Sequence, residues 1–161
     1  MRQLLFVPVL FLFIASSCNS SKSVYNSKPA VSKNTSLVDF VRSTSLEPVL
    51  TKAKKENKLV FLDFYTSWCA PCKLMDKDVF THRETADFLN KNFVNYKINA
   101  EKNNGPDLAM IYGVNSFPTL LFIDAKGRVV LRHVGAAYQT QLKEIGQIAL
   151  NQRSALSHSS R

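Results

Sequence analysis

The sequence predicts an α/β fold in which a mixed sheet of four to five strands is covered by helices on both faces. Helical and strand patterns alternate along the chain in an order that calls for such a sheet. Leu59–Tyr65 is a short apolar and aromatic run, typical of a strand buried on both faces. Two further apolar runs, 119–123 and 129–134, are separated by Asp-Ala-Lys-Gly, a turn sequence that favours an antiparallel hairpin.

The first helix is expected to begin at Ser45, whose side chain can cap it, and to end near Asn57. Its apolar residues fall at helical spacing: Leu46, Val49, Leu50 and Ala53. The buried strand comes next, and a second helix follows the cysteine motif described below and continues to about Val79.

The remaining elements are predicted from caps and periodicity. Thr81 and Glu84 form a capping-box pattern ahead of a third helix, and the alternation of apolar and polar residues over 94–98 is that of a strand. Gly105 opens a short helix that Gly113 can close in a left-handed conformation. The hairpin follows, and the inner face of a last helix is formed by Leu142, Ile145 and Ala149.

Length, cysteine count and charge limit the classes of protein to consider. At 161 residues the chain has room for one domain with a hydrophobic core and hardly for two. Its three cysteines exclude both a small disulfide-stapled protein and a zinc site of four cysteines. The formal charge of +9 suggests nucleic acid or anionic lipid as a partner. Because the lysines are scattered along the sequence and no nucleic-acid motif is present, we prefer a solvated basic surface and expect no nucleic-acid partner.

The N-terminus has the regions of a cleaved export signal. Arg2 gives a positive charge, Leu4–Ala15 is apolar but shorter than the ~20 residues that span a bilayer as a helix, and small residues precede Cys18. The stretch resembles a bacterial lipoprotein signal, which implies that residues 1–17 are removed and Cys18 is lipidated. The alternative is an ordinary secretory signal with an incidental Cys18. Asn19 after the cysteine favours the outer membrane.

The expected domain organisation follows from composition. Residues 18–36 are mostly Ser, Lys and Asn with little to bury, so we expect a flexible tether that holds a domain away from a lipid surface. Residues 37–153 are assigned to the folded domain, and 154–161 to a disordered tail.

The sequence Trp-Cys-Ala-Pro-Cys-Lys at 68–73 stands where the buried strand ends and a helix begins. A cysteine at a helix N-terminus faces unpaired N–H groups and the positive end of the helix dipole, which lower the pKa of its thiol. The second cysteine lies within the first turn and can reach the first sulfur. Cys69 and Cys72 are therefore predicted to alternate between dithiol and disulfide. A structural zinc site is disfavoured, because it needs four ligands and the three histidines form no second pair at ligand spacing.

These residues resemble the thioredoxin family, and the resemblance extends over 37–153. Its strongest stretch is Leu62–Lys73, and the second is Tyr112–Thr119, where the family has a cis-proline. The segments Cys72–Phe80 and Phe88–Val94 are more similar to the thioredoxin-like C-terminal domain of transmembrane thiol–disulfide reductases than to cytosolic thioredoxin. The resemblance implies the thioredoxin fold.

The resemblance also implies roles for individual residues. Cys69 would be the attacking thiolate and Cys72 the resolving thiol. Asp63 would assist deprotonation of the second cysteine, with Lys97 as its partner. A carboxylate within an apolar strand draws attention independently, because a buried charge is costly unless it is paired or functional. The alternative is an aspartate at a strand end that reaches solvent.

Substrate contacts are implied around the cysteine pair. Pro118 would be cis and lie beside the pair, with the backbone of Phe117 offering hydrogen bonds to an extended substrate segment. Ala70 and Pro71 separate the cysteines and help set the redox potential. Trp68 would pack against the motif and shape its surface; the alternative is a plain core aromatic.

Together, these features predict an extracytoplasmic thiol–disulfide oxidoreductase that reduces or isomerises protein disulfides, although an oxidant remains an alternative. The redox-active pair Cys69 and Cys72 needs no further cofactor. Expected partners are protein thiols and disulfides, a membrane reductase as electron donor, and the membrane itself through the lipid on Cys18. The protein would be a periplasmic monomer on the membrane. The competing hypothesis is a lipid-anchored binding or chaperone module of the same fold.

Overall fold

The computed structural model describes residues 36–159 of the chain, and side chains as far as residue 155. The predicted signal peptide, Cys18 and nearly all of the predicted tether lie outside the described residues. Within residues 36–159, no helix is both long enough and apolar enough to span a membrane.

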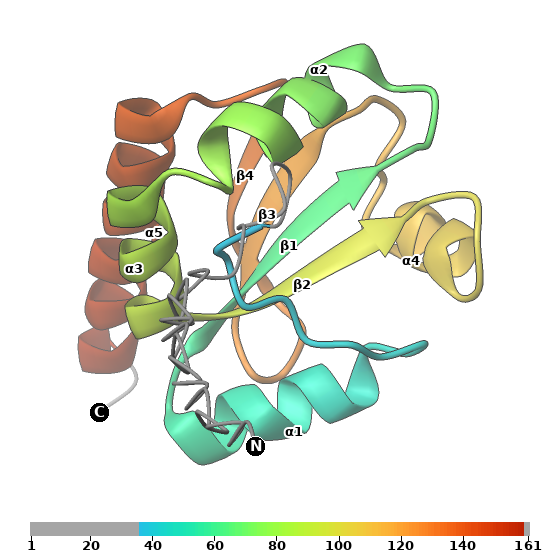
Figure 1. Cartoon of the computed structure of the whole chain (residues 1–161). Helices are drawn as coiled ribbons and strands as arrows, with labels where there is room; N and C mark the ends of the chain where they lie inside the picture. Colours follow the sequence, from blue (N-terminus) through green and yellow to red (C-terminus); the bar gives the residue numbers. More distant parts are fainter. Residues whose placement is uncertain (1–35, 160–161) are drawn as a thin grey trace, which may run out of the picture. The chain divides into compact units, whose positions relative to one another are not determined.

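A four-stranded mixed sheet forms the centre of the domain (Figure 1). The spatial order of its strands is β2, β1, β3, β4; β2 runs parallel to β1, whereas β3 and β4 run antiparallel to their neighbours. The bounds are β1 (Leu59–Tyr65), β2 (Phe93–Asn99), β3 (Thr119–Ile123) and β4 (Val129–Val134). A single parallel bridge between Phe40 and Asn95 takes the place of a fifth strand beyond β2. The predicted mixed sheet and its C-terminal hairpin are confirmed.

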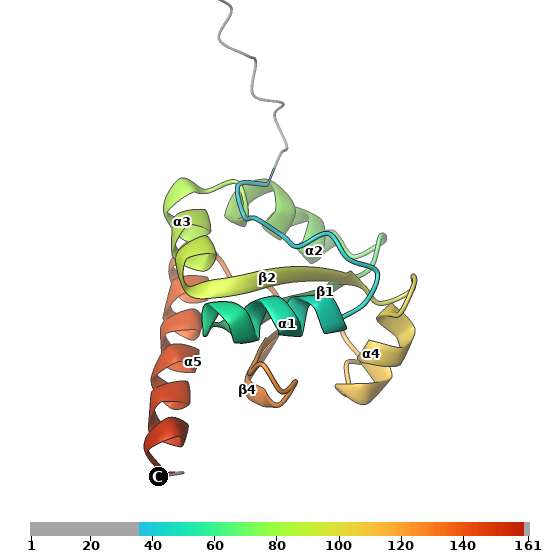
Figure 2. The same ribbon diagram turned by 90° about the horizontal axis from the view of Figure 1, so that it is seen from below.

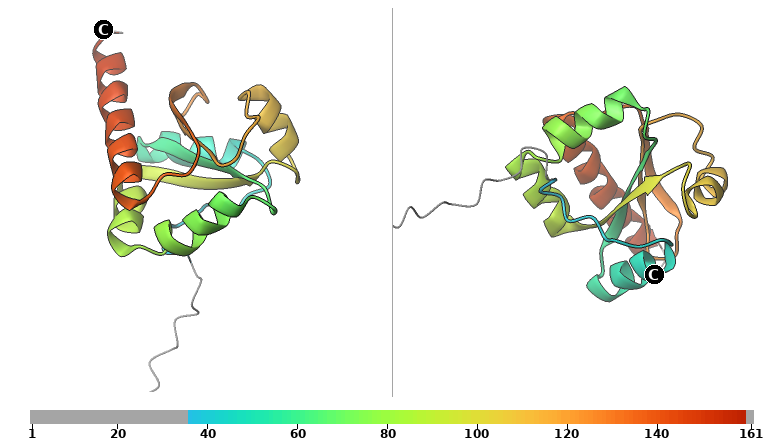
Figure 3. Two further views of the ribbon diagram at one scale, coloured as in Figure 1. Left: turned by 90° about the horizontal axis from the view of Figure 1, so that it is seen from above. Right: turned by 45° about the vertical axis from the view of Figure 1, so that its right-hand side comes forward.

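Helices cover both faces of the sheet, as predicted (Figure 2). One face carries α1 (Glu47–Glu56) and α4 (Gly105–Ile111). The other carries α2 (Ala70–Leu74), its π-helical continuation η1 (Met75–Val79), α3 (Arg83–Asn92) and α5 (Gln139–Ser159). α5 runs beside α3, and its far end extends beyond the sheet (Figure 3).

The alternation of side chains along β1 creates two hydrophobic cores. Leu59 and Phe61 pack with the face that carries α3 and α5, whereas Val60, Leu62 and Phe64 pack with the face that carries α1 and α4. All five are at most 1% exposed. Since burial of each such side chain contributes roughly 1.5–3 kcal/mol, β1 anchors both layers and fixes the direction in which it delivers the chain to the cysteine motif.

Both predicted side-chain caps are wrong. α1 begins after Leu46, which has helical backbone angles and is buried, so the helix start is set by core packing and not by Ser45. α3 begins after His82 without a side-chain cap, because the Thr81 hydroxyl donates instead to the carbonyl of Lys77, 2.5 Å away. The sequence therefore predicted that both helices exist, but it did not predict the hydrogen bonds at the first residues of α1 and α3.

Glycines mark the ends of α4 as expected. A Cβ on Gly105 would lie 1.9 Å from the Asn99 carbonyl oxygen, so only glycine allows the helix to start this close to the end of β2. Gly113 has φ +60°, the left-handed conformation predicted to close the helix.

The last helix is longer than predicted. α5 continues to Ser159, so most of the segment assigned to a disordered tail from Ser154 is helical. No glycine or proline interrupts the chain after Gly146, and the Ser154 hydroxyl donates to the Leu150 carbonyl at 3.1 Å. The Arg153 guanidinium also donates to the Asn57 carbonyl, which ties the helix to the end of α1.

Candidate active site

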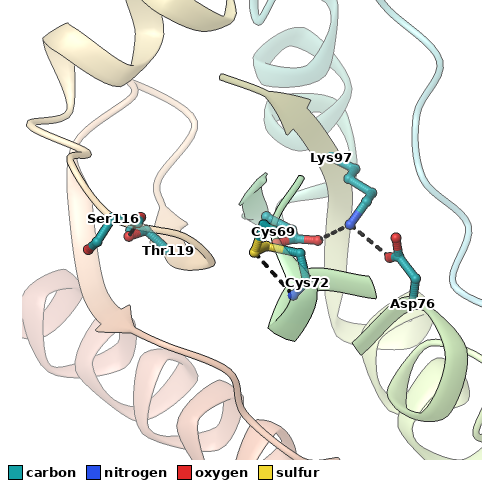
Figure 4. Close-up of a disulfide and its surroundings, with 7 residues drawn as sticks. Cys69, Cys72, Asp76, Lys97, Ser116 and Thr119 are labelled. Atoms are coloured by element: carbon teal, nitrogen blue, oxygen red, sulfur yellow. Dashed lines mark hydrogen bonds and ion pairs between the residues drawn. A yellow bond between two sulfur atoms is a disulfide. The ribbon is translucent and has the colours of Figure 1, made fainter. Parts of the chain in front are cut away.

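Cys69 and Cys72 form a disulfide at the point where β1 has ended and α2 begins, with Cα atoms 5.4 Å apart (Figure 4). Cys69 is the N-cap of α2, and its sulfur accepts a hydrogen bond from the backbone N–H of Cys72 at 3.2 Å. The predicted pairing within one helical turn is thus observed in its oxidised state. When the disulfide opens, the same N–H groups and the helix dipole favour a thiolate on Cys69.

The disulfide lies within the surface and does not protrude from it. Cys69 is 3% exposed and Cys72 is 2% exposed, whereas Ala70 and Pro71 between them are exposed. A substrate must therefore contact the surrounding surface to bring its own sulfur to the pair.

Asp63 lies on β1, six residues before Cys69, and is buried, with 1% of its surface exposed. It lies opposite Lys97 in the pairing of β1 with β2, and the Lys97 ammonium forms an ion pair with its Oδ2. Its other oxygen, Oδ1, has no hydrogen-bond partner among the described residues. The alternative of a solvated aspartate at a strand end is excluded by this burial.

A second carboxylate, Asp76, completes the cluster and was not predicted. Its Oδ1 lies 2.8 Å from the Lys97 ammonium, and its side chain is 45% exposed. Figure 4 shows Lys97 reaching between the cysteine pair and Asp76. Asp76 stands four residues after Cys72, a spacing that would place both side chains on one face of a helix. This spacing was the sequence signal from which Asp76 could have been predicted as a site residue.

The cluster shifts both pKa values. Burial raises the pKa of Asp63 above its ordinary 3.8, although the Lys97 ammonium offsets part of the effect. Burial by itself would lower the pKa of Lys97, but the carboxylates of Asp63 and Asp76 outweigh it and raise that pKa above 10.5. The rings of Tyr65 and Phe80, 4.4 and 5.1 Å from the ammonium, further favour the charged lysine. Both shifts favour the protonated form: Lys97 holds its proton more tightly than an ordinary lysine, and Asp63 is more basic than an ordinary aspartate.

The predicted cis-proline is present. The Phe117–Pro118 peptide bond is cis, and the Pro118 carbonyl accepts a hydrogen bond from the Gly135 N–H at 2.8 Å. The Thr119 hydroxyl donates to the Ser116 carbonyl at 2.8 Å, on the segment that Figure 4 shows facing the cysteine pair.

Trp68 links this segment to the cysteine motif. Its ring meets that of Phe117 edge to face, with centroids 6.0 Å apart. Its indole N–H donates to Glu101 Oε1 at 2.8 Å, a partner that sequence analysis missed. Because Trp68 is 65% exposed, the core-aromatic alternative is wrong.

Exposed apolar side chains come from the elements around the disulfide. Val134 precedes Gly135, the residue hydrogen-bonded to Pro118, Tyr138 stands three residues after Gly135, and Leu74 is the last residue of α2. With Trp68, these residues form what we call the apolar rim: Trp68, Leu74, Val134 and Tyr138. Such a rim suits a partner that presents apolar side chains beside its disulfide. Among residues 36–159, no group of three or more His, Cys, Asp or Glu side chains is arranged to hold a metal ion.

Comparison with known proteins matches residues 46–148 to the model of the thioredoxin-like domain family. The chain belongs to this family. Relatives include Thioredoxin-T of Drosophila melanogaster (39% identical over 80 residues, 50% of this chain and 47% of the relative) and the thiol:disulfide interchange protein DsbD of Vibrio vulnificus (35% over 101 residues, 60% and 17%). The chain thus spans less than half the length of these two relatives.

A solved structure, that of a proposed disulphide-isomerase from Bacteroides thetaiotaomicron, is 41% identical with a TM-score of 0.63, covering 70% of this chain and 93% of the other. The C-terminal domain of Neisseria meningitidis DsbD has the same fold, with 24% identity, a TM-score of 0.53, and coverage of 65% and 93%. Both a thioredoxin and DsbD are thus among the relatives of the chain, which confirms the resemblance to the family, whereas the expected greater similarity to the reductase domain stays a prediction. Together with the Cys69–Cys72 disulfide, these homologues support protein-disulfide oxidoreductase activity.

Proposed function

We propose that this thioredoxin-like protein acts outside the cytoplasm, where it reduces or isomerises protein disulfides with the Cys69 and Cys72 dithiol. The observation that carries the proposal is the redox pair at the N-terminus of α2, together with a buried carboxylate with an unpartnered oxygen on β1, the strand that leads into the cysteine motif. The pair supplies two electrons, and the carboxylate supplies an acceptor for the proton that must leave the second thiol.

The reaction proceeds in two exchanges. The Cys69 thiolate attacks one sulfur of the substrate disulfide, forming a mixed disulfide and releasing the other substrate sulfur as a thiolate, which takes a proton from water. The Cys72 thiol then loses its proton and attacks the Cys69 sulfur. This step forms the Cys69–Cys72 bond and releases the second substrate sulfur, so the substrate gains the two electrons that the protein loses.

Asp63 accepts the Cys72 proton in this scheme. Oδ1 is the free acceptor, because Oδ2 is held by Lys97. The raised pKa of Asp63 makes its carboxylate a better proton acceptor than an ordinary aspartate. Lys97 also contacts the half-exposed Asp76, so the cluster extends from the buried base to water and gives the proton a way out.

Membrane attachment through Cys18, a periplasmic site on the outer membrane, a membrane reductase as electron donor and a monomeric state belong to the same proposal. They rest on the signal-like N-terminus and on similarity to DsbD, named a thiol:disulfide interchange protein. Ala70-Pro71 differs by one methyl group from the Gly-Pro of reducing thioredoxins, which favours reduction over oxidation.

Insulin reduction tests the proposal. With dithiothreitol as electron source, the full chain should accelerate precipitation of the insulin B chain, and Cys69→Ser should reduce the rate to that of dithiothreitol alone. Cys18→Ser serves as the matched control, since it removes a cysteine outside the pair and should leave the rate unchanged. An intact chain that gave no acceleration would favour the binding or chaperone module.

A further inference from the structure

A basic pocket lies at the end of the domain opposite the disulfide. β1 begins at this end with Leu59 and leads away towards Cys69; its seven residues span about 20 Å. The pocket has a volume of about 230 Å³, several times the ~30 Å³ of one water molecule. The end of α1, the turn between β3 and β4 and the distal part of α5 meet there, in the lower part of Figure 1.

Four cationic side chains line the pocket, and they come from three separate parts of the sequence: Lys54, Lys58, Lys126 and Arg153. Its single acidic lining residue, Asp124, is already engaged: its carboxylate accepts hydrogen bonds from the backbone N–H groups of Lys126 and Arg128, and the Arg128 guanidinium lies 2.6 Å away. The pocket therefore has a surplus of positive charge.

Three of these cations, Lys54, Lys126 and Arg153, have no anionic partner in the described part of the chain. Lys58 contacts Glu56 at 3.1 Å, and Arg153 donates to the Asn57 carbonyl. Lys54 and Lys126 are exposed and take part in no ion pair among the described residues. The dipole at the C-terminus of α1 supplies only about half a negative charge, which does not balance them. The described residues therefore do not supply an anion that balances these cations, so a balancing anion has to come from outside this part of the chain.

We propose that this pocket docks the domain on the anionic phosphate headgroups of a phospholipid bilayer. The inference rests on the proposed membrane attachment, which keeps the domain within reach of the lipid surface. Each basic side chain near such a surface strengthens binding by about fivefold, and only those within a Debye length of about 8 Å contribute. Because the disulfide lies at the other end of β1, docking directs the apolar rim away from the bilayer and towards soluble substrates.

Lysine footprinting on vesicles tests the docking. The full chain isolated from membranes is reconstituted into phosphatidylcholine vesicles, with or without a third of phosphatidylglycerol, and amine acylation is quantified by mass spectrometry. Lys54 and Lys126 should be acylated about fivefold more slowly on the anionic vesicles, and high salt should abolish the difference. The internal control is Lys102, an exposed lysine beside the Trp68 partner Glu101, whose acylation should not change.

Equal acylation of Lys54 on both vesicles, or equal protection of Lys102, would overturn the proposal. Inorganic phosphate added to the neutral vesicles distinguishes a free anion from a lipid: protection as strong as that on anionic vesicles would assign the pocket to a soluble phosphate and overturn bilayer docking. Flotation with neutral vesicles reports membrane attachment separately, and insulin reduction reports the redox function separately.

Charge reversal supplies the matched variants. Lys54→Glu with Lys126→Glu should remove the lipid-dependent protection of backbone amides at 124–128, measured by hydrogen exchange. Lys91→Glu with Lys102→Glu changes the net charge equally and should retain it. Both double variants should reduce insulin at the parent rate, which verifies that the fold is intact. Loss of protection in both would mean that net charge, not the pocket, attracts the bilayer.

Discussion

The fold buries Asp63 in surroundings that disfavour its ionised form. Its carboxylate is 1% exposed, and burial raises its pKa despite the ion pair with Lys97. An acid with a raised pKa in the folded state binds its proton more tightly there than in the unfolded chain. Its contribution to stability is therefore present at low pH and is lost as the pH rises from 3.8 through the folded pKa.

Asp63→Asn should consequently be at least as stable as the parent at neutral pH. The advantage should grow by about 1.4 kcal/mol per pH unit between the ordinary and the raised pKa, and level off above it. Urea denaturation of the reduced protein from acid to neutral pH measures this dependence.

The same variant should be slower when Cys72 resolves the mixed disulfide, with the largest deficit near neutral pH. Stopped-flow reduction of a model disulfide across pH measures it. A loss of several kcal/mol of stability with normal turnover at every pH would make Asp63 a structural residue and remove it from the mechanism.

Asp76→Asn isolates the outer carboxylate. The negative charge of Asp76 contributes to the raised pKa of Asp63. When this charge is removed, the Lys97 ammonium forms an ion pair with Asp63 alone. Both effects lower the pKa of Asp63, so the rise of the resolution rate should move to lower pH. Stability should change by less than about 1 kcal/mol, as for other partly exposed ion pairs.

Asp78→Asn is the matched control for this variant, because Asp78 is an exposed aspartate on the same π-helical turn with no ion pair among the described residues. Its pH profile should coincide with that of the parent. Coincidence of the Asp76→Asn profile with the parent would mean that Asp76 does not influence the proton acceptor.

These residues also mark what sequence can predict about the site. Asp63 was detectable because a carboxylate within an apolar strand is anomalous, and Lys97 followed from resemblance to the family. Asp76 and Glu101 were missed because their roles depend on where a π-helical turn and a loop place them against other elements. Periodicity specifies which face of an element is buried but not which polar side chains meet across two elements.

At the scale of elements, the start of α2 separates the roles of the two cysteines. Cys69 is the N-cap, with extended backbone angles, and its sulfur receives the Cys72 N–H; Cys72 lies inside the first turn. Helix N–H groups therefore stabilise negative charge on the first sulfur. The second sulfur depends on a nearby base.

Cys72→Ser should therefore trap substrates as stable mixed disulfides on Cys69, whereas Cys69→Ser should trap few. Acid-quenched samples on non-reducing gels measure the difference. A further change, Cys18→Ser, is combined with each variant so that the third cysteine cannot form adducts. Equal trapping by the two variants would show that the roles are not divided in this way.

The elements themselves were largely predictable, and their ends were not. Local sequence patterns predicted three features that the fold contains: the burial of β1 on both faces, the turn between β3 and β4, and the left-handed Gly113. The start of α1 and the length of α5 are set by contacts far along the chain, such as that of Arg153 with Asn57. A local pattern contains no information about such contacts.

At the scale of the whole molecule, the charged residues show most clearly that side chains far apart in the sequence can lie together in the fold. The lysines are scattered along the chain, which favoured a uniformly solvated basic surface. The fold instead brings Lys54, Lys126 and Arg153 to one pocket, at the end of β1 remote from the disulfide. A domain with its redox centre at one end and a cationic pocket at the other is suited to work at an anionic surface, provided that it is held there.

Attachment at Cys18 is therefore the prediction on which the behaviour of the whole molecule depends. A short apolar segment and small residues precede Cys18, as in bacterial lipoprotein signals, so the mature chain should begin at this residue and carry acyl chains. A single acyl chain gives only marginal membrane binding, whereas several acyl chains give stable anchoring. Mass spectrometry of the detergent-extracted protein should find an acylated N-terminal Cys18, and Cys18→Ser should shift the protein from the membrane to the soluble fraction or leave its signal uncleaved. Cleavage at another residue, or an unmodified Cys18 at the mature N-terminus, would replace the anchored protein with a secreted one, and the basic pocket would then have to hold the bilayer without a tether.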